Sequence, residues 1–303
     1  MDYSKGFAAG YTAVISPALV NNFRWRFTRQ SVGNIGDSDQ PYIHFRGMDQ
    51  GVTRSSEFQM PMHNFVNDLS WTKGKHTFQF GTNLGFIRDR RLSTTNSFSD
   101  GIANSAWIDT GGFAQSGSNP LNPANGSYPA VGDAFANSYD FPMIAVLGMV
   151  TEVDATYNFG KTGDLLAQGA PIKRDFAEDY YEWYAQDTYR IKPNLTLIFG
   201  LRYSLYSPPW ETNGLQAAPS RDLGTFFAQR QQQMQAGIPS NTDDLITFNL
   251  SGPANGKPGF YNWDKKSFAP RISVAWTPEP KGWLRKLLSD KDKTIVPGGV
   301  GIV

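Results

Sequence analysis

The segment YYEWYAQDTYRIKPNLTLIFGLRYSLYSPPWE, residues 180–211, contains two long stretches of alternating apolar and polar residues on either side of Pro193-Asn194. In the second stretch every other residue is apolar, and Ile198 is the only apolar residue at the positions between them. The apolar positions are Leu195, Leu197, Phe199, Leu201, Tyr203 and Leu205. A period of two predicts a β-strand with one apolar face. The alternation covers about 11 residues, roughly what a tilted strand needs to cross a hydrocarbon layer of ~30 Å. The segment therefore predicts a hairpin of membrane-spanning strands.

The same alternation recurs along the chain. Phe23, Trp25 and Phe27 alternate with Arg24 and Arg26, and similar patterns flank the Lys73-Gly74-Lys75 turn and fill the stretch that ends at Trp276. We predict strands at residues 8–16, 20–29, 57–72, 76–90, 178–190, 195–206, 266–277 and 294–303.

The connections between these strands alternate in length. Short turns are expected at Pro17, Lys73 and Pro193, and long polar segments at about 31–56, 91–177 and 207–265; a turn of medium length at 278–293 is the exception. Outer-membrane barrels have short periplasmic turns and long extracellular loops. The sequence therefore predicts an all-β, antiparallel, up-and-down transmembrane β-barrel. Aromatic residues beside the short turns are expected at the periplasmic interface, namely Trp71, Tyr189, Trp276 and Trp283.

Composition agrees with this fold class. The mean hydropathy of −0.42 and the lack of an apolar run near about 18 residues exclude a helical membrane protein. Aromatic residues make up 14% of the chain, which suits the aromatic girdles of a barrel wall. The net charge of +1 gives no indication of a nucleic-acid partner. The absence of cysteine excludes disulfides and thiolate chemistry.

Three segments within the connections have patterns of their own. Residues 141–160 are expected to add no membrane strand, and to form a short helix followed by a strand that prolongs the barrel wall. Residues 226–237 have helix-forming composition. Residues 281–293 combine leucines and Trp283 with lysines and arginine, which fits either an amphipathic element at the inner interface or an ordinary turn helix.

Catalytic motifs find little support. Asp109-Thr110-Gly111 matches the triplet of aspartic proteases, but it opens a loop rich in glycine, serine and asparagine and has no second copy. The sequence Gly298-Gly299-Val300-Gly301 mimics a phosphate loop but lacks its Gly-Lys ending and its helix. We expect no enzyme activity and no cofactor.

Titratable residues likewise form no recognisable site. His44, His63 and His76 are far apart in sequence and lack the paired spacing of metal ligands, so no metal site is expected. Among the acidic residues around the strand that begins near 178, Glu182 faces away from Asp179 and Asp187 at strand spacing. Ordinary lumen or rim charges explain these carboxylates best.

A second group of charged and polar residues occupies the predicted polar faces of the strands. Because barrel interiors are generally polar, these residues are candidates to face the lumen, where they either solvate the interior or contact a plug or an anionic solute. The candidates are Arg24, Arg26, Glu182, Gln186, Arg202 and Arg271.

Five segments resemble barrel hairpins of TonB-dependent receptors, in particular the Oar-like subfamily with a carboxypeptidase-regulatory-like domain. They are YAQDTYRIKPNLTLIFGLRYSLYSPPWE, NDLSWTKGKHTFQFGTNL, SPALVNNFRWRFTR, FAPRISVAWTP and KTIVPGGVGIV, which together cover about a third of the chain. The last motif usually carries an arginine where this chain has Pro297. The resemblance implies a barrel of roughly 22 strands with a plugged lumen.

Residues 1–303 would then be a portion of that wall, about eight strands, without the plug, the coupling box or a secretory signal. The resemblance implies a location in the cell outer membrane of a Gram-negative-type bacterium, with outer-membrane lipid, the plug of the same protein and a TonB-type complex as partners. The implied function is energy-dependent uptake of a solute. The alternatives are a passive porin-like channel, or a secreted β-rich protein that binds or hydrolyses carbohydrate. An incomplete wall is expected to aggregate in water, because its edges are unpaired and its outer face is apolar.

Overall fold

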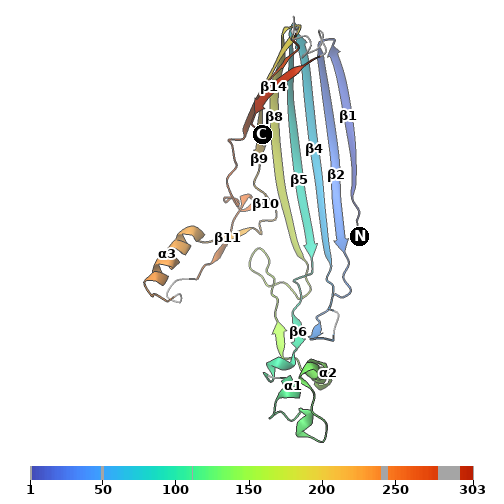
Figure 1. The fold of residues 1–303 in the computed structure, drawn as a ribbon, viewed down its shortest axis with the longest axis vertical. Helices are drawn as coiled ribbons and strands as arrows, with labels where there is room; N and C mark the ends of the chain where they lie inside the picture. Colours follow the sequence, from blue (N-terminus) through green and yellow to red (C-terminus); the bar gives the residue numbers. More distant parts are fainter. Residues whose placement is uncertain (1, 49–50, 111, 240–244, 279–293, 303) are drawn as a thin grey trace, which may run out of the picture. The chain divides into compact units, whose positions relative to one another are not determined.

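Long antiparallel strands dominate the chain. A computed structural model describes residues 2–48, 51–110, 112–239, 245–278 and 294–302. The main sheet, here called the wall, has the strand order β1-β2-β4-β5-β8-β9-β13-β14 (Figure 1). The long strands are β1 (Lys5–Ser16), β2 (Leu19–Asn34), β4 (Ser56–Lys73), β5 (His76–Ser93), β8 (Ile172–Lys192), β9 (Leu195–Tyr206), β13 (Phe268–Trp276) and β14 (Val296–Gly301).

The wall follows the order of the sequence, as expected of an up-and-down barrel. Strands that are neighbours in the wall are also successive long strands of the chain. Within the described residues β1 pairs only with β2, and β14 only with β13, so the sheet is open. The predicted all-β class, the eight long strands and their up-and-down order are confirmed. The 281–293 segment and Trp283 lie outside the described residues.

The register of β8 and β9 shows why the sequence alternates. Tyr181 pairs with Leu205, Trp183 with Tyr203, and Tyr189 with Leu197. Directly opposed residues of an antiparallel pair project from the same face of a sheet. The apolar positions of both strands therefore fall on one face. Ile198 pairs with Thr188 and Ser273, which places this one apolar exception on the other face.

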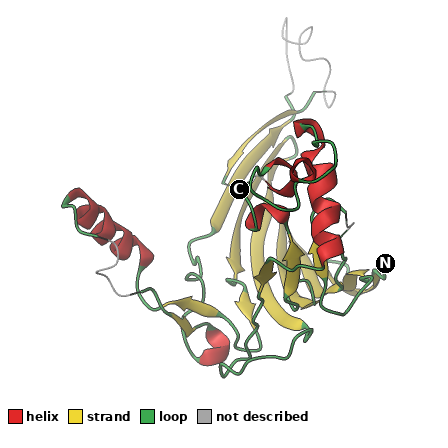
Figure 2. Cartoon of the chain, turned by 90° about the horizontal axis from the view of Figure 1, so that it is seen from below, coloured by secondary structure: helices red, strands yellow, loops and turns green. Residues whose placement is uncertain are grey.

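Two compact units divide the chain. The first comprises residues 1–2, 31–58 and 90–174, and the second residues 3–30, 59–89 and 175–303. Helices belong to the connecting segments and not to the wall (Figure 2).

The first unit contains a small sheet and a small core. Its strands are β3 (Ile43–Phe45), β6 (Asp100–Ala103) and β7 (Glu152–Asp154), with β6 between the other two. Its helical elements are η1 (Ser105–Trp107), α1 (Gly112–Gln115), η2 (Pro123–Asn125), η3 (Asp133–Phe135) and α2 (Ala136–Leu147). Ala103, Phe113 and Ile144 are fully or almost fully buried and form the core.

One buried carboxylate fixes the start of α1. Asp140 of α2 accepts hydrogen bonds from the backbone N–H groups of Phe113 and Ala114, at 3.0 and 2.8 Å. Gly112 has a φ of +69°, and a Cβ there would lie 1.9 Å from the Asp140 carboxylate. Only glycine permits this approach and this backbone conformation.

The prediction for residues 141–160 was partly wrong. The segment adds no strand to the wall, as expected, and α2 supplies the expected helix. The strand that follows, β7, does not prolong the wall, because it pairs with β6 in the three-stranded sheet of the first unit. The physical reason is that the apolar residues of α2 have a local core to pack against, which holds the following strand beside β6.

The connection between β9 and β13 contains further short elements. They are β10 (Trp210–Glu211), which pairs with β8, the pair β11 (Ala217–Pro219) and β12 (Phe248–Leu250), η5 (Pro253–Asn255), and helix α3 (Leu223–Gln235). Helix α3 confirms the helix expected from the composition of residues 226–237. Asp222 caps it by accepting hydrogen bonds from the N–H and the hydroxyl of Thr225, at 2.7 and 2.8 Å.

The cap of α3 should respond to pH. The backbone N–H of Thr225 and then its hydroxyl favour the ionised carboxylate, and these bonds lower the pKa of Asp222. The stabilisation is therefore present above the ordinary pKa of an aspartate and is lost as the pH falls through the lowered value. We expect amide exchange in the first turn of α3 to accelerate in that acidic range.

Hydrogen exchange on the whole protein, corrected for the intrinsic pH dependence, measures this effect. Asp222→Ala should lose the protection at every pH, and Asp222→Asn should keep it without the acid transition, because asparagine also caps helices. Equal acid sensitivity of the wild type and Asp222→Asn would contradict the role of the carboxylate.

Candidate functional site

The wall has two chemically distinct faces, and the candidate site lies on the polar one. Pairing fixes which residues share it: Glu182 lies opposite Ser204, Arg202 opposite Tyr184, and Gly200 opposite both Gln186 and Arg271. On β2, Arg24 lies opposite Gly10 and Arg26 opposite Ala8. We call the face that carries these residues the polar face.

All six lumen candidates named from the sequence project from this polar face. The structure brings Gln186 and Arg271 into direct contact, with the guanidinium donating to the Gln186 amide oxygen. Gln186 in turn donates to Gln79 at 2.9 Å. Arg24 forms an ion pair with Asp68 at 2.5 Å. That these residues face a lumen stays a prediction.

Glu182 is a hub of the polar face. One of its carboxylate oxygens accepts from the hydroxyls of Tyr206 at 2.9 Å and Ser204 at 3.3 Å. The other accepts from the Asn83 amide at 2.6 Å. These contacts link β5, β8 and β9 through one side chain. The three donors hold the carboxylate in one position and stabilise its negative charge.

Two tyrosines of β8 lie across the neighbouring strand β5. The Tyr184 hydroxyl donates to Asp68 of β4 at 2.7 Å, and the Tyr180 hydroxyl accepts from Asn64 of β4 at 3.0 Å. The rings cross β5 where it has glycine: a Cβ on Gly81 would lie 2.1 Å from the Tyr184 ring. A Cβ on Gly85 would lie 2.0 Å from the Tyr180 ring. Each glycine makes room for one ring.

These residues were missed from the sequence, although a signal was present. Tyr180 and Tyr184, Gly81 and Gly85, and Asn64 and Asp68 are each separated by four positions, on three strands that become neighbours. A spacing of four places residues on one face of a strand. The spacing became meaningful only when the pairing of β4, β5 and β8 was known.

A groove opens on the polar face toward β13 and β14. It has a volume of about 690 Å³, and its charged lining includes Glu182, Arg202, Lys266 and Arg271. Both signs of charge are therefore available to a solute or to a protein segment that enters it.

The opposite face, here called the aromatic face, carries two groups of rings. One row runs from β1 to β13 through contacts with ring centroids 4.5–6.3 Å apart, formed by Phe7, Trp25, Phe65, Phe86, Tyr181, Trp183, Tyr203 and Phe268. The second group lies beside the short turns, where Trp71 contacts Phe78 at 5.4 Å and His76 contacts both Phe78 and Tyr189.

The separation of these groups matches a membrane. Phe78 and Phe86 are eight positions apart, as are Tyr181 and Tyr189. At ~3.3 Å per residue this is ~26 Å along a strand, or ~20 Å along the membrane normal for a strand tilted by ~40°. Outer-membrane barrels have an apolar band about 25 Å tall between two aromatic girdles. The spacing of the two ring groups is therefore close to that of the girdles on a lipid-facing surface.

Several polar groups on the aromatic face are paired. His76 Nδ1 lies 2.6 Å from Asp187, whose side chain is 5% exposed. Asn21 and Asn67 each donate an amide hydrogen to the other at 3.0 Å. Pairing lowers the cost of keeping these groups away from water.

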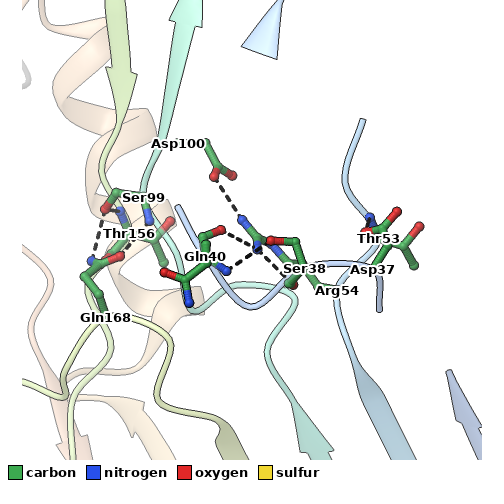
Figure 3. Close-up of polar contacts among 9 residues, drawn as sticks. All are labelled: Asp37, Ser38, Gln40, Thr53, Arg54, Ser99, Asp100, Thr156 and Gln168. Atoms are coloured by element: carbon green, nitrogen blue, oxygen red, sulfur yellow. Dashed lines mark hydrogen bonds and ion pairs between the residues drawn. The ribbon is translucent and has the colours of Figure 1, made fainter. Parts of the chain in front are cut away.

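The first unit is organised by a buried arginine. The Arg54 side chain is 7% exposed, and its guanidinium donates to the carbonyls of Gln40 and Ser38 at 2.7 and 3.1 Å (Figure 3). It also pairs with Asp100 at 3.1 Å and lies 4.0 Å from the centroid of the Phe98 ring. Residues 38–40 and strand β6 are thereby joined by one side chain.

Two further contacts order the same unit. Gln168 donates to the Ser99 hydroxyl at 3.1 Å and to the Thr156 carbonyl at 3.0 Å, and Thr53 N–H donates to Asp37 at 2.8 Å (Figure 3). These bonds hold together stretches that are far apart in the sequence.

The residues considered for catalysis or for metal binding are dispersed. Asp109 accepts from the Asn119 amide at 3.2 Å in a loop, His63 stacks on Trp25, and His44 belongs to β3. Within the described residues no group of three or more acidic, histidine or cysteine side chains has the arrangement of a metal site. None of the helices in the described residues is long and apolar enough to cross a membrane.

The wall is a continuous sheet with one polar face and one face that carries two groups of aromatic rings. This arrangement is typical of a protein that crosses a membrane with β-strands. The chain belongs to the outer membrane beta barrel domain family, whose model matches residues 2–303. The protein is therefore located in the outer membrane. No curated protein and no solved structure matches the chain.

We expect Gly81→Ala to destabilise the wall. The added methyl must displace the Tyr184 ring, and overpacking of this kind costs about 1–3 kcal/mol. The urea midpoint of unfolding from lipid vesicles, followed by tryptophan fluorescence, measures the change. Gly298→Ala is the matched control, because a Cβ there meets its nearest neighbour at 3.8 Å. Tyr184→Ala should relieve the clash in the double variant; equal effects of Gly81→Ala with and without the ring would contradict this geometry.

The aromatic face should reject charge. Leu201→Arg is expected to cost about 2–4 kcal/mol, as arginine does on the lipid face near the bilayer midplane. Ser273→Arg, on the polar face of the adjacent strand, should cost much less. The same unfolding measurement separates the two, and similar losses in both variants would contradict the assignment of the faces.

Proposed function

We propose that this chain is part of the wall of an outer-membrane receptor that takes up a solute by energy-dependent transport. The observation that carries the proposal is that the β2–β4 and β5–β8 connections together form an ordered unit, with a small core, a three-stranded sheet and the buried Arg54 side chain. A receptor needs an ordered surface to recognise its ligand, and these connections supply one. Long connections of this family of barrels are extracellular.

The polar face supports the same proposal. Glu182, Tyr184 and Arg271 are held by neighbouring strands in fixed positions, and the adjacent groove offers both signs of charge. Such a surface suits contact with a plug domain of the same protein. The resemblance of five hairpins to TonB-dependent receptors supplies the energy-coupled step, for which a TonB-type complex is the partner.

Further strands are part of the proposal. The outer edges of β1 and β14 carry backbone groups that lipid cannot satisfy, so a barrel must pair them. We propose that additional strands of the same protein close the wall. The passive porin-like channel is the alternative function, and a secreted β-rich protein is at odds with the outer-membrane family.

Measurement of ion conductance distinguishes a plugged receptor from a passive channel. The complete protein, reconstituted in a planar bilayer, should show no steady conductance, because a plug closes the lumen. It should also be retained by the immobilised periplasmic domain of a TonB-type protein, with a porin as the negative control. A steady ohmic conductance together with no retention would establish the passive channel instead.

A further inference from the structure

Two lysines lie on the aromatic face beside the short turns. Lys73 shares this face with Trp71, and its ammonium lies 5.5 Å from the centroid of the Trp71 ring. Lys192 lies opposite Leu195, which lies opposite Trp276 in the next strand. A register shift between Arg190 and Lys192 turns Lys192 onto this face. Two lysines thus border the ring group of the short-turn end.

Negative charge on the same surface is buried. Asp187 is the carboxylate that the register places on this face near the short turns in the described part of the chain. It is buried and contacts His76, which stacks on the Tyr189 ring with centroids 4.2 Å apart. The rings of His76 and Tyr189 therefore present an aromatic surface, and the lysines supply its exposed charge.

We propose that this surface, formed by Trp71, Lys73, His76, Tyr189 and Lys192, binds the headgroup of an anionic phospholipid. This surface adjoins the apolar middle of the aromatic face. An acyl chain can therefore lie along the wall while the phosphate reaches the lysines. Lysine places its charge at the interface with its stem along apolar surface. Short turns lie on the periplasmic side, so the lipid belongs to the inner leaflet. The inference is independent of energy coupling and rests only on the barrel's place in the membrane.

Charge complementarity decides in favour of an anionic lipid over a zwitterionic one. Each lysine near a membrane surface favours anionic lipid by about fivefold in binding. Two lysines without an exposed carboxylate beside them therefore predict roughly twenty-five-fold preference. The surrounding rings contribute equally to the binding of an anionic and a zwitterionic lipid, so they do not discriminate between the two.

Native mass spectrometry of the complete protein tests the proposal. The protein is released from vesicles of phosphatidylglycerol and phosphatidylcholine in equal amounts, and the retained lipids are counted. We expect retention of phosphatidylglycerol in the wild type and loss of the preference in Lys73→Gln/Lys192→Gln. Lys73→Arg/Lys192→Arg should retain it, which shows that charge and not folding decides the result.

Two controls define what would overturn the proposal. Lys161→Gln/Lys265→Gln removes the same charge from the long connections, where both side chains are exposed, and should keep the preference. Equal loss in this control would show an effect of net charge alone. Displacement of phosphatidylglycerol by inorganic phosphate would show a site for free anions, and equal retention of both lipids by the wild type would show no selectivity. Each of these results overturns the proposal.

Discussion

The structure depends on the need to pair backbone hydrogen-bonding groups that lie in lipid. A strand cannot satisfy its own N–H and C=O groups, so each strand of the wall needs a neighbour on both sides. This requirement explains the continuous order from β1 to β14 and the close agreement between successive strands of the chain and neighbours in the wall. It is also the basis of our proposal that further strands close the wall.

Once pairing is satisfied, the two faces take separate roles. Rings on the aromatic face form two groups that are separated along the strands, and several polar groups on this face are paired, as in His76 with Asp187. The polar face instead joins strands through side chains, as Tyr184 does by crossing Gly81 to reach Asp68. Packing and hydrogen bonding on the polar face thus add rigidity that lipid contact alone does not give.

Prediction from sequence succeeded where the signal was local and repeated. The alternation around Leu201 predicted which residues of β9 share a face, and the turn at Pro193 predicted where β9 begins. The six polar candidates shared a face for the same reason. The error at residues 141–160 arose because β7 has a partner, β6, that is far away in sequence and whose short strand has no marked alternation. The contacts of Tyr180 with Gly85 and of Tyr184 with Gly81 were missed because each contact joins two different strands.

The sequence by itself determined that the chain forms long two-faced strands joined by alternating short and long connections, because a period of two and turn residues act over a few positions. Only the tertiary structure decided which polar side chains meet. Register between strands places Tyr180 over Gly85, Glu182 beside Tyr206 and Arg54 beside Asp100. These contacts join residues far apart in the chain, and their geometry follows from pairing and packing of the whole sheet or unit, which local pattern does not encode.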